Sequence, residues 1–206
     1  MSNFYFEKIK RIQALSEIGL EFYNNEWDAE RFQEIREIAM HMLEKMTDVP
    51  IEKIIPVIEE KNGYKTPKVD VRAVVFNEQN EILLVQEKAD NKWAIPGGWA
   101  DINFSPKEVA EKECMEEAGL DVKAVRLLAV MDKQKQNMTP AFEYVYKIFL
   151  LCEKQGHSLS TGPETSNVGW FDEKNIPELS EPRNTRSIVN MMFQFHRNEI
   201  TEPYFD

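Results

Sequence analysis

The first part of the chain carries apolar side chains at helical spacing. One such series lies within residues 4–23, and a second follows Asp28, which we expect to be its N-cap. Pro50 opens a third, shorter series that ends near Lys61-Asn62-Gly63. The pattern therefore predicts an antiparallel helical hairpin and a short helix. The apolar positions of the hairpin are Ile9, Ile12, Leu15, Gly19 and Phe22 in the first helix, and Phe32, Ile35, Ile38, Met42 and Met46 in the second.

Beyond residue 68 the helical spacing gives way to short segments rich in β-forming residues. We therefore expect a helical domain at residues 1–63 and a second domain at residues 64–206. Two or three amphipathic helices cannot bury both of their apolar flanks alone, so the first domain is predicted to pair two subunits into a homodimer. Strands are predicted at residues 69–76, 81–86, 92–95, 124–131, 144–152 and 168–171, and a closing helix at 185–197.

One helix in the second domain is marked at both ends by its sequence. Ser105 is expected at the N-cap, Pro106 at the first helical position, and Glu108 in a capping box. Gly119 follows the last helical residue, where a left-handed conformation ends many helices. These signals predict a helix over residues 106–118.

The same helix carries three glutamates on one face. Glu113, Glu116 and Glu117 are three or four residues apart or adjacent, and like charges at helical spacing repel unless a cation intervenes. Hard carboxylate oxygens suit Mg²⁺ or Mn²⁺. Taken alone, the segment is more typical of a solvated acidic face than of a metal site. A neighbouring stripe of small residues, which lets the helix lie close to a sheet, consists of Ala110, Cys114 and Ala118.

Residues 95–120 read I-P-G-G-W-A-D-I-N-F-S-P-K-E-V-A-E-K-E-C-M-E-E-A-G-L. They resemble the Nudix hydrolase box, G-x5-E-x7-R-E-U-x-E-E-x-G-U, where U is aliphatic. The resemblance implies that the glutamates and the Gly97 carbonyl hold Mg²⁺ or Mn²⁺, with Glu113 and Glu117 acting in catalysis. It also implies an α/β fold, a Nudix-type mixed sheet between helices. Counted from Gly98, the residues in register are Glu113, Glu116, Glu117, Gly119 and Leu120.

Two positions depart from the box. Phe104 stands where the family usually has Glu, and Lys112 stands where it has Arg. Lysine lacks the planar fork with which arginine orients a carboxylate, so the polar network around the glutamates is expected to differ. Asp101 is a candidate for supplying the missing acidity, and Phe104 is expected to pack beneath the loop.

Outside the box, the resemblance points to further site residues. Glu164, in G-P-E-T-S-N-V-G-W-F, matches an acidic loop residue that many family members use as a base or extra ligand; a turn acid is the alternative, and Glu143 is a rival base. Arg72 and Arg183 are candidates to bind phosphate. Trp99 and Trp93 bracket the glycines and either stack on a base or cation or pack in the core. Trp27 and Tyr64 are further aromatic candidates.

Charge and composition exclude several classes of protein. The formal net charge of −11 argues against general affinity for nucleic acid or anionic membranes, which need basic surfaces. Two scattered cysteines are too few for a disulfide framework or a zinc site. No apolar run reaches the ~18 residues of a membrane span, and no signal peptide is recognisable, so a cytoplasmic location is expected.

The resemblance implies hydrolysis of a nucleoside diphosphate linked to another group. The segments R-I-Q-A-L-S-E-I-G-L-E-F-Y, R-E-I-A-M and L-S-E-P-R-N-T look like the Nudix subgroup with an N-terminal helical domain that includes CDP-choline pyrophosphatases. The expected substrate is therefore CDP-choline. Two alternatives stay open: a pyrophosphohydrolase of RNA ends or mononucleotides, and a catalytically inactive Nudix-like ligand sensor.

Overall fold

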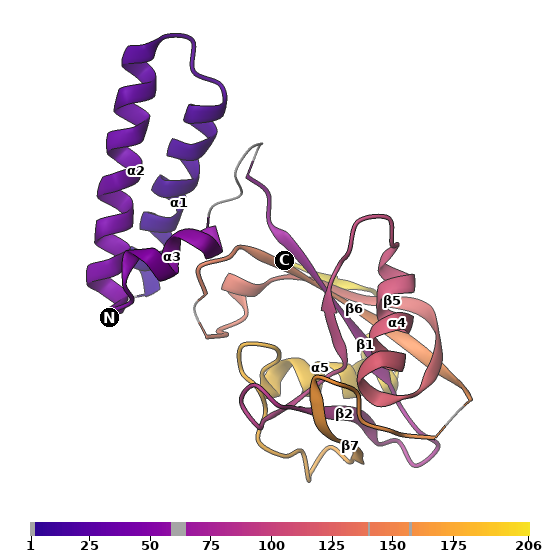
Figure 1. Ribbon diagram of the computed structural model, residues 1–206. Helices are drawn as coiled ribbons and strands as arrows, with labels where there is room; N and C mark the ends of the chain where they lie inside the picture. The colour runs from indigo at the N-terminus through magenta and orange to yellow at the C-terminus, as the bar shows by residue number, and fades with distance from the viewer. Residues whose placement is uncertain (1–2, 59–64, 140, 157) are drawn as a thin grey trace. The chain divides into compact units, whose positions relative to one another are not determined.

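The computed structural model describes residues 3–58, 65–139, 141–156 and 158–206, and these fall into two compact units (Figure 1). Unit 1 is assigned Met1–Pro67 and Pro140–Glu143, and unit 2 is assigned Lys68–Thr139 and Tyr144–Asp206. The boundary predicted between residues 63 and 64 lies outside the described residues, as does Tyr64. No helix in the described ranges is both long and apolar enough to cross a membrane.

Unit 1 is the helical hairpin expected from the sequence, with α1 (Asn3–Glu21), α2 (Glu26–Thr47) and the short α3 (Ile51–Ile58). The predicted start of α2 was wrong by three residues. Asn25, not Asp28, is the N-cap, because the Asn25 side chain accepts a hydrogen bond from the Asp28 backbone N–H at 2.9 Å. The buried core of the unit consists of Phe6, Ile9, Ala39, Met40, Leu43 and Ile54.

Much of the apolar hairpin surface is left outside this core. Of the first helical series, Ile9 is buried, whereas most of the remaining large residues of both series are exposed. Exposed apolar area of this extent on a helical hairpin is typical of an interaction surface. We call this set the hairpin stripe: Ile12, Leu15 and Phe22 on α1, and Ile35, Ile38 and Met42 on α2, with 40–61% of each residue exposed.

Unit 2 contains a five-stranded sheet in the order β4-β1-β6-β5-β8 and a three-stranded sheet in the order β3-β2-β7. The larger sheet is mixed, because β1 runs parallel to β6 and antiparallel to β4. The strands are β1 (Lys68–Val75), β2 (Ile82–Glu87), β3 (Trp93–Ala94), β4 (Gly97–Trp99), β5 (Asp121–Asp132), β6 (Val145–Gly156), β7 (Thr165–Phe171) and β8 (Tyr204–Phe205). This architecture confirms the predicted Nudix-type mixed sheet between helices, preceded by helices.

Two helices cover opposite sides of the strands (Figure 1). The α4 helix (Pro106–Ala118) packs its small stripe against β1 and β6, with Cys114 and Cys152 both buried in that contact. The α5 helix (Arg186–His196) closes the other core, around Phe149 of β6. The strands therefore lie between two apolar layers, and polar groups within them must find partners in the protein or in a cavity.

The motif helix begins and ends where the sequence predicted. The Ser105 side chain accepts from the Glu108 N–H, the Glu108 carboxylate returns to Ser105, and Gly119 adopts φ 65°. The burial expected for Phe104 was wrong, because 46% of that residue is exposed. Asn103, directly before it, has a left-handed backbone with φ +73°.

Candidate active site

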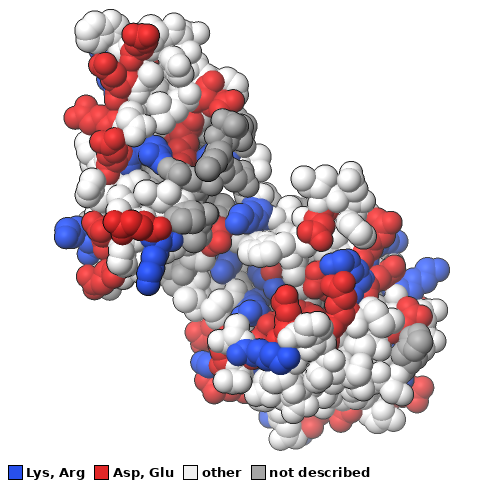
Figure 2. All heavy atoms as spheres, in the orientation of Figure 1, with Lys and Arg blue, Asp and Glu red and all other residues white. Residues whose placement is uncertain are grey.

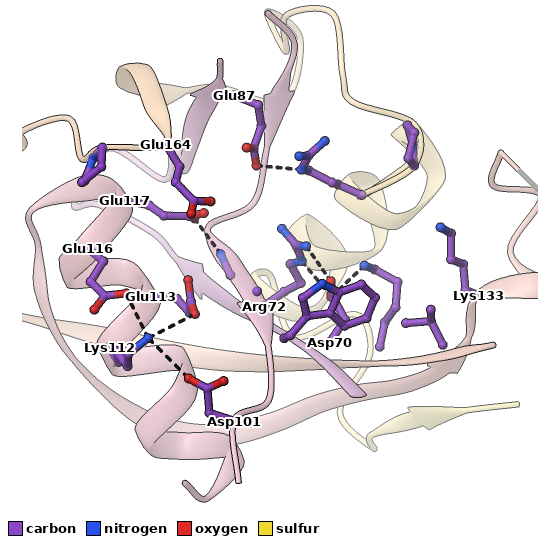
Figure 3. A pocket seen from close by; sticks show the side chains of 18 residues that line it. Asp70, Arg72, Glu87, Asp101, Lys112, Glu113, Glu116, Glu117, Lys133 and Glu164 are labelled. Carbon is purple, nitrogen blue, oxygen red and sulfur yellow. Dashed lines mark hydrogen bonds and ion pairs between the residues drawn. The ribbon is translucent and has the colours of Figure 1, made fainter. Parts of the chain in front are cut away.

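A cavity of about 750 Å³ lies within unit 2, next to β4 and α4 (Figure 3). It gathers side chains from β1, β2, β4, α4 and β6 and from the loops before β7 and α5. The charged residues that line it are Asp70, Arg72, Glu87, Asp101, Lys112, Glu113, Glu116, Glu117, Lys133, Lys147, Glu164 and Arg183. Figure 2 shows that acidic and basic side chains are interleaved on the visible face of this unit.

The α4 glutamates form one wall of the cavity. Glu117 is buried, and its Oε2 accepts a hydrogen bond from the Gly97 N–H at 2.9 Å. Burial raises the pKa of Glu117 to about 8, although Arg72 and the Gly97 N–H act in the opposite direction. Burial also raises the pKa of Glu113. Burial therefore disfavours the ionised form of both carboxylates, and a bound cation would favour it.

Lys112 supplies one positive charge beside the α4 glutamates. Its ammonium lies 3.0 Å from Glu116, 3.7 Å from Glu113 and 3.8 Å from Asp101 (Figure 3). The Lys112 ammonium, a single positive charge, thus lies among three carboxylates. Asp101 is one of them, and it lies beside Lys112, which stands where the family has Arg. The flexible amine replaces the planar fork as the group that collects these side chains.

The donor set suits a hard divalent cation. Within the described parts of the chain, no three Asp, Glu, His or Cys side chains are close enough to hold a metal ion as they stand. The reason is visible in the contacts, because Glu117 turns to Gly97 and Glu116 turns to Lys112. All the candidate donors are oxygens, and a β-carbon on Gly98 would lie 3.0 Å from the Glu113 carboxylate, so the glycine keeps this approach open. The residues fit a magnesium-type site.

A second group of charges occupies the β1–β6 side. Asp70, Arg72 and Lys147 are buried, and Arg72 donates from Nε and Nη2 to the two oxygens of Asp70 at 2.8 and 2.6 Å. Its Nη1 donates to the Ile95 carbonyl at 3.0 Å. Burial alone would raise the pKa of Asp70, but Arg72 and Lys147 hold it well below its usual range. Arg72, predicted to bind phosphate, is therefore committed to protein partners.

Arg183 also has protein partners, but its side chain is 27% exposed where it lines the cavity. Its Nε lies 2.8 Å from Glu87, and its Nη1 contacts Ser180 and Asp90 at 3.0 and 3.5 Å. Glu87 is buried, and burial raises its pKa despite the Arg183 charge. The sequence missed Glu87 and Asp90 because neither belongs to a recognisable pattern.

The remaining predicted residues separate into two groups. Glu164 lines the cavity, and Figure 3 places its carboxylate beside Glu117. Trp99 also lines it, half exposed, with the Lys68 ammonium 5.5 Å from the ring centroid. Trp93 instead packs edge-on against Phe171, with 4.7 Å between the ring centroids, which is the core packing expected as its alternative role. Glu143 is not among the lining residues and is assigned to unit 1.

Comparison with known proteins identifies both halves of the chain. The family model described as NUDIX domain matches residues 66–191, and the model described as UDP-X-like, N-terminal oligomerisation domain matches residues 5–58. The Bacillus subtilis (strain 168) protein YjhB, named provisionally as an ADP-ribose pyrophosphatase, is 40% identical over 202 residues, which is 98% of this chain and 97% of the relative.

Two solved structures also resemble this chain. A crystal structure of an ADP-ribose pyrophosphatase from Streptococcus suis 89-1591 is 42% identical, covers 68% of this chain and 100% of its own, and superposes with a TM-score of 0.62. A UDP-X diphosphatase is 28% identical over 98% of both chains, with a TM-score of 0.64. The second match includes the helical unit as well as the strands.

Proposed function

Because the chain belongs to the NUDIX domain family, whose members hydrolyse phosphoric anhydrides, we propose that it splits the diphosphate of a nucleoside diphosphate linked to another group. We propose CDP-choline as the substrate. The products would be CMP and phosphocholine. The observation that carries the reaction class is the cavity itself, in which the α4 carboxylates face a wall of buried cations.

Charge balance makes this chemistry dependent on a metal. The cavity lining contributes seven carboxylates and five Lys or Arg side chains, a formal net charge of −2. A diphosphate adds further negative charge, so an additional cation would favour its binding. Nudix hydrolases generally use a divalent ion such as Mg²⁺, and Mg²⁺, or Mn²⁺ in its place, is the proposed cofactor.

We assign the cofactor to Glu113, Glu116, Glu117 and the Gly97 carbonyl. When bound there, a divalent ion neutralises phosphate oxygens and lowers the pKa of a coordinated water. Glu113 and Glu117 would share the contact with the reacting centre. Glu164, beside Glu117 in the cavity, is the proposed base that accepts a proton from the attacking water.

The identity of the second group is the finer part of the proposal. CDP-choline is proposed from the likeness of the N-terminal segments and P-R-N-T to the subgroup that includes CDP-choline pyrophosphatases, although the family model that matches residues 5–58 is described as UDP-X-like. Trp99 offers a half-exposed aromatic face at the cavity for a trimethylammonium. ADP-ribose is the second candidate, because two relatives of 40% and 42% identity carry that activity in their names.

We expect CDP-choline to give the highest kcat/KM with Mg²⁺ among CDP-choline, ADP-ribose, a UDP-sugar and a 5′-triphosphorylated oligonucleotide. A lead of about ten-fold, or ~1.4 kcal/mol in transition-state stabilisation, is enough to decide between them. The same lead for any of the other three would reject CDP-choline and keep the reaction class. Metal-dependent turnover of any one of the four would exclude an inactive sensor, and preference for the oligonucleotide would favour the RNA-end alternative.

We further propose that unit 1 forms a homodimer through the hairpin stripe. Light scattering is expected to give twice the chain mass at micromolar concentration, because the exposed apolar side chains of α1 and α2 gain burial only against another surface. Ile38→Glu should shift the protein to monomer. Gln33→Glu, a polar change on the same helix, is the matched control, and a monomeric wild-type protein would end the dimer proposal.

A further inference from the structure

The buried charges on the β1–β6 side of the cavity do not balance. Arg72 and Lys147 share one carboxylate, Asp70, and the three residues are between 1% and 5% exposed. The Lys147 ammonium lies 2.7 Å from Asp70 Oδ1, on the oxygen that also accepts from Arg72 Nε. Two cations and one carboxylate give the cluster a formal charge of +1 when all three groups are ionised. The cluster lines the cavity, and a buried charge is stable when it has a partner, so a ligand in the cavity can supply the missing negative charge.

The two cations differ in how fully the protein uses them. Arg72 donates three hydrogen bonds, two to Asp70 and one to Ile95. Lys147 donates one, to Asp70, although an ammonium has three N–H donors. Within the described ranges, two of the three N–H donors of Lys147 and two of the five of Arg72 thus have no protein partner, and Lys147 is the cation held by fewer contacts.

The charged groups that face Lys147 are Asp70 and Arg72 from β1 and Lys133 from the 3-10 turn η1 (Lys133–Lys135). Burial, followed by Arg72, lowers the pKa of Lys147 to about 7, and Asp70 opposes them only in part. An additional anion beside the ammonium would stabilise its charged form.

We propose that Lys147 binds a phosphate oxygen of the substrate diphosphate, on the side of the cavity away from the α4 glutamates. Asp70 and Arg72 act as positioning residues that hold the ammonium at the cavity wall. This role deepens the proposed function and rests on it, since the ligand is the diphosphate that the family cleaves. Lys147 thereby takes the task that the sequence suggested for Arg72 and Arg183.

The test measures binding of methylenediphosphonate, a diphosphate that cannot be hydrolysed and has no base, in the presence of Mg²⁺. K147M is expected to weaken binding at about pH 6 by at least about ten-fold, because a buried charged contact to the ligand is lost. K92M is the matched control: Lys92 also meets a single carboxylate, Glu178 at 2.8 Å, but it does not line the cavity. The affinity of K92M for methylenediphosphonate should equal that of the wild-type protein.

A second variant separates charge from shape. K147R keeps a charge at every working pH, so the ratio of wild-type to K147R affinity should fall several-fold between about pH 6 and about pH 9, as the lysine loses its proton. Titration of the ligand and of the metal site cancels in this ratio. The ratio also decides the question if K147M does not fold, which thermal melting would reveal.

The inference is overturned if wild type does not bind the diphosphonate, if K147M binds as tightly as wild type, or if the ratio is constant with pH. Failure of the proposed function has a different signature. In that case wild type hydrolyses none of the four candidate substrates, whatever its affinity for the diphosphonate.

Discussion

Replacing either Glu113 or Glu117 by Gln is expected to lower kcat by at least about 10²-fold at saturating Mg²⁺, because each change removes an anionic ligand from the ion that stabilises the transition state. Glu117 should be the more sensitive of the two to metal concentration. It is the more deeply buried of the two, and its carboxylate is held in place by the Gly97 N–H. Steady-state kinetics across a Mg²⁺ titration measures both effects.

Two further variants serve as comparisons for Glu113→Gln and Glu117→Gln. Glu116→Gln should lose less, because the Glu116 side chain is 54% exposed and already paired with Lys112. Glu111→Gln is the matched control on the same helix: Glu111 accepts a hydrogen bond from the Ala124 N–H at 2.9 Å, which a glutamine oxygen can also accept, and it does not line the cavity. Near wild-type rates for both Glu113→Gln and Glu117→Gln with metal saturated would refute the site assignment.

Gly97→Ala is expected to lower the free energy of unfolding of unit 2 by at least about 3 kcal/mol, through a strained backbone and steric overlap. Gly97 has φ +145°, and a β-carbon there would lie 2.0 Å from the Val71 carbonyl oxygen and 2.8 Å from the Arg72 Cα. Both atoms belong to the backbone of β1, which pairs with β4 at this point. The overlap can be relieved only by separating the two strands.

Chemical denaturation followed by circular dichroism measures this loss. Gly156→Ala is the control, because a β-carbon at Gly156 meets no atom within 4 Å, and its effect should stay within about 0.5 kcal/mol. Gly97→Ala should also lose activity, since the Gly97 N–H holds Glu117. Wild-type stability in this variant would show that β4 can move away from β1 without cost.

Features fixed by local chemistry were predictable. The α4 helix was placed to the residue because its capping box and its terminal glycine act within one turn of the chain. The β4 and β8 strands were not predicted, since two or three residues show no periodicity and exist as strands only through their pairing with β1 and β5. The start of α2 failed for a related reason, because Asn25 and Asp28 are both good caps.

The site was predictable as far as its motif extended. Whether a basic residue is available to a ligand depends on its partners, and the carboxylate partners of Arg183 come from positions more than 90 residues earlier in the chain. Lys147 did carry a signal. It stands in V-Y-K-I-F-L-L, and a charge inside an otherwise apolar strand indicates either a buried partner or a cavity.

The parallel pairing of β1 with β6 also bears on how the chain folds. Lys147 and Asp70 are 77 residues apart in sequence, and everything from the motif glycines to α4 and β5 lies in the loop that their contact closes. Closing so long a loop costs entropy before its contacts repay it, so we expect this pairing to follow formation of the local helix and hairpins. During synthesis, α4 can form while β6 is still inside the ribosome. The glutamates would then be present before Lys147, and the catalytic cavity would be among the last parts of the molecule to assemble.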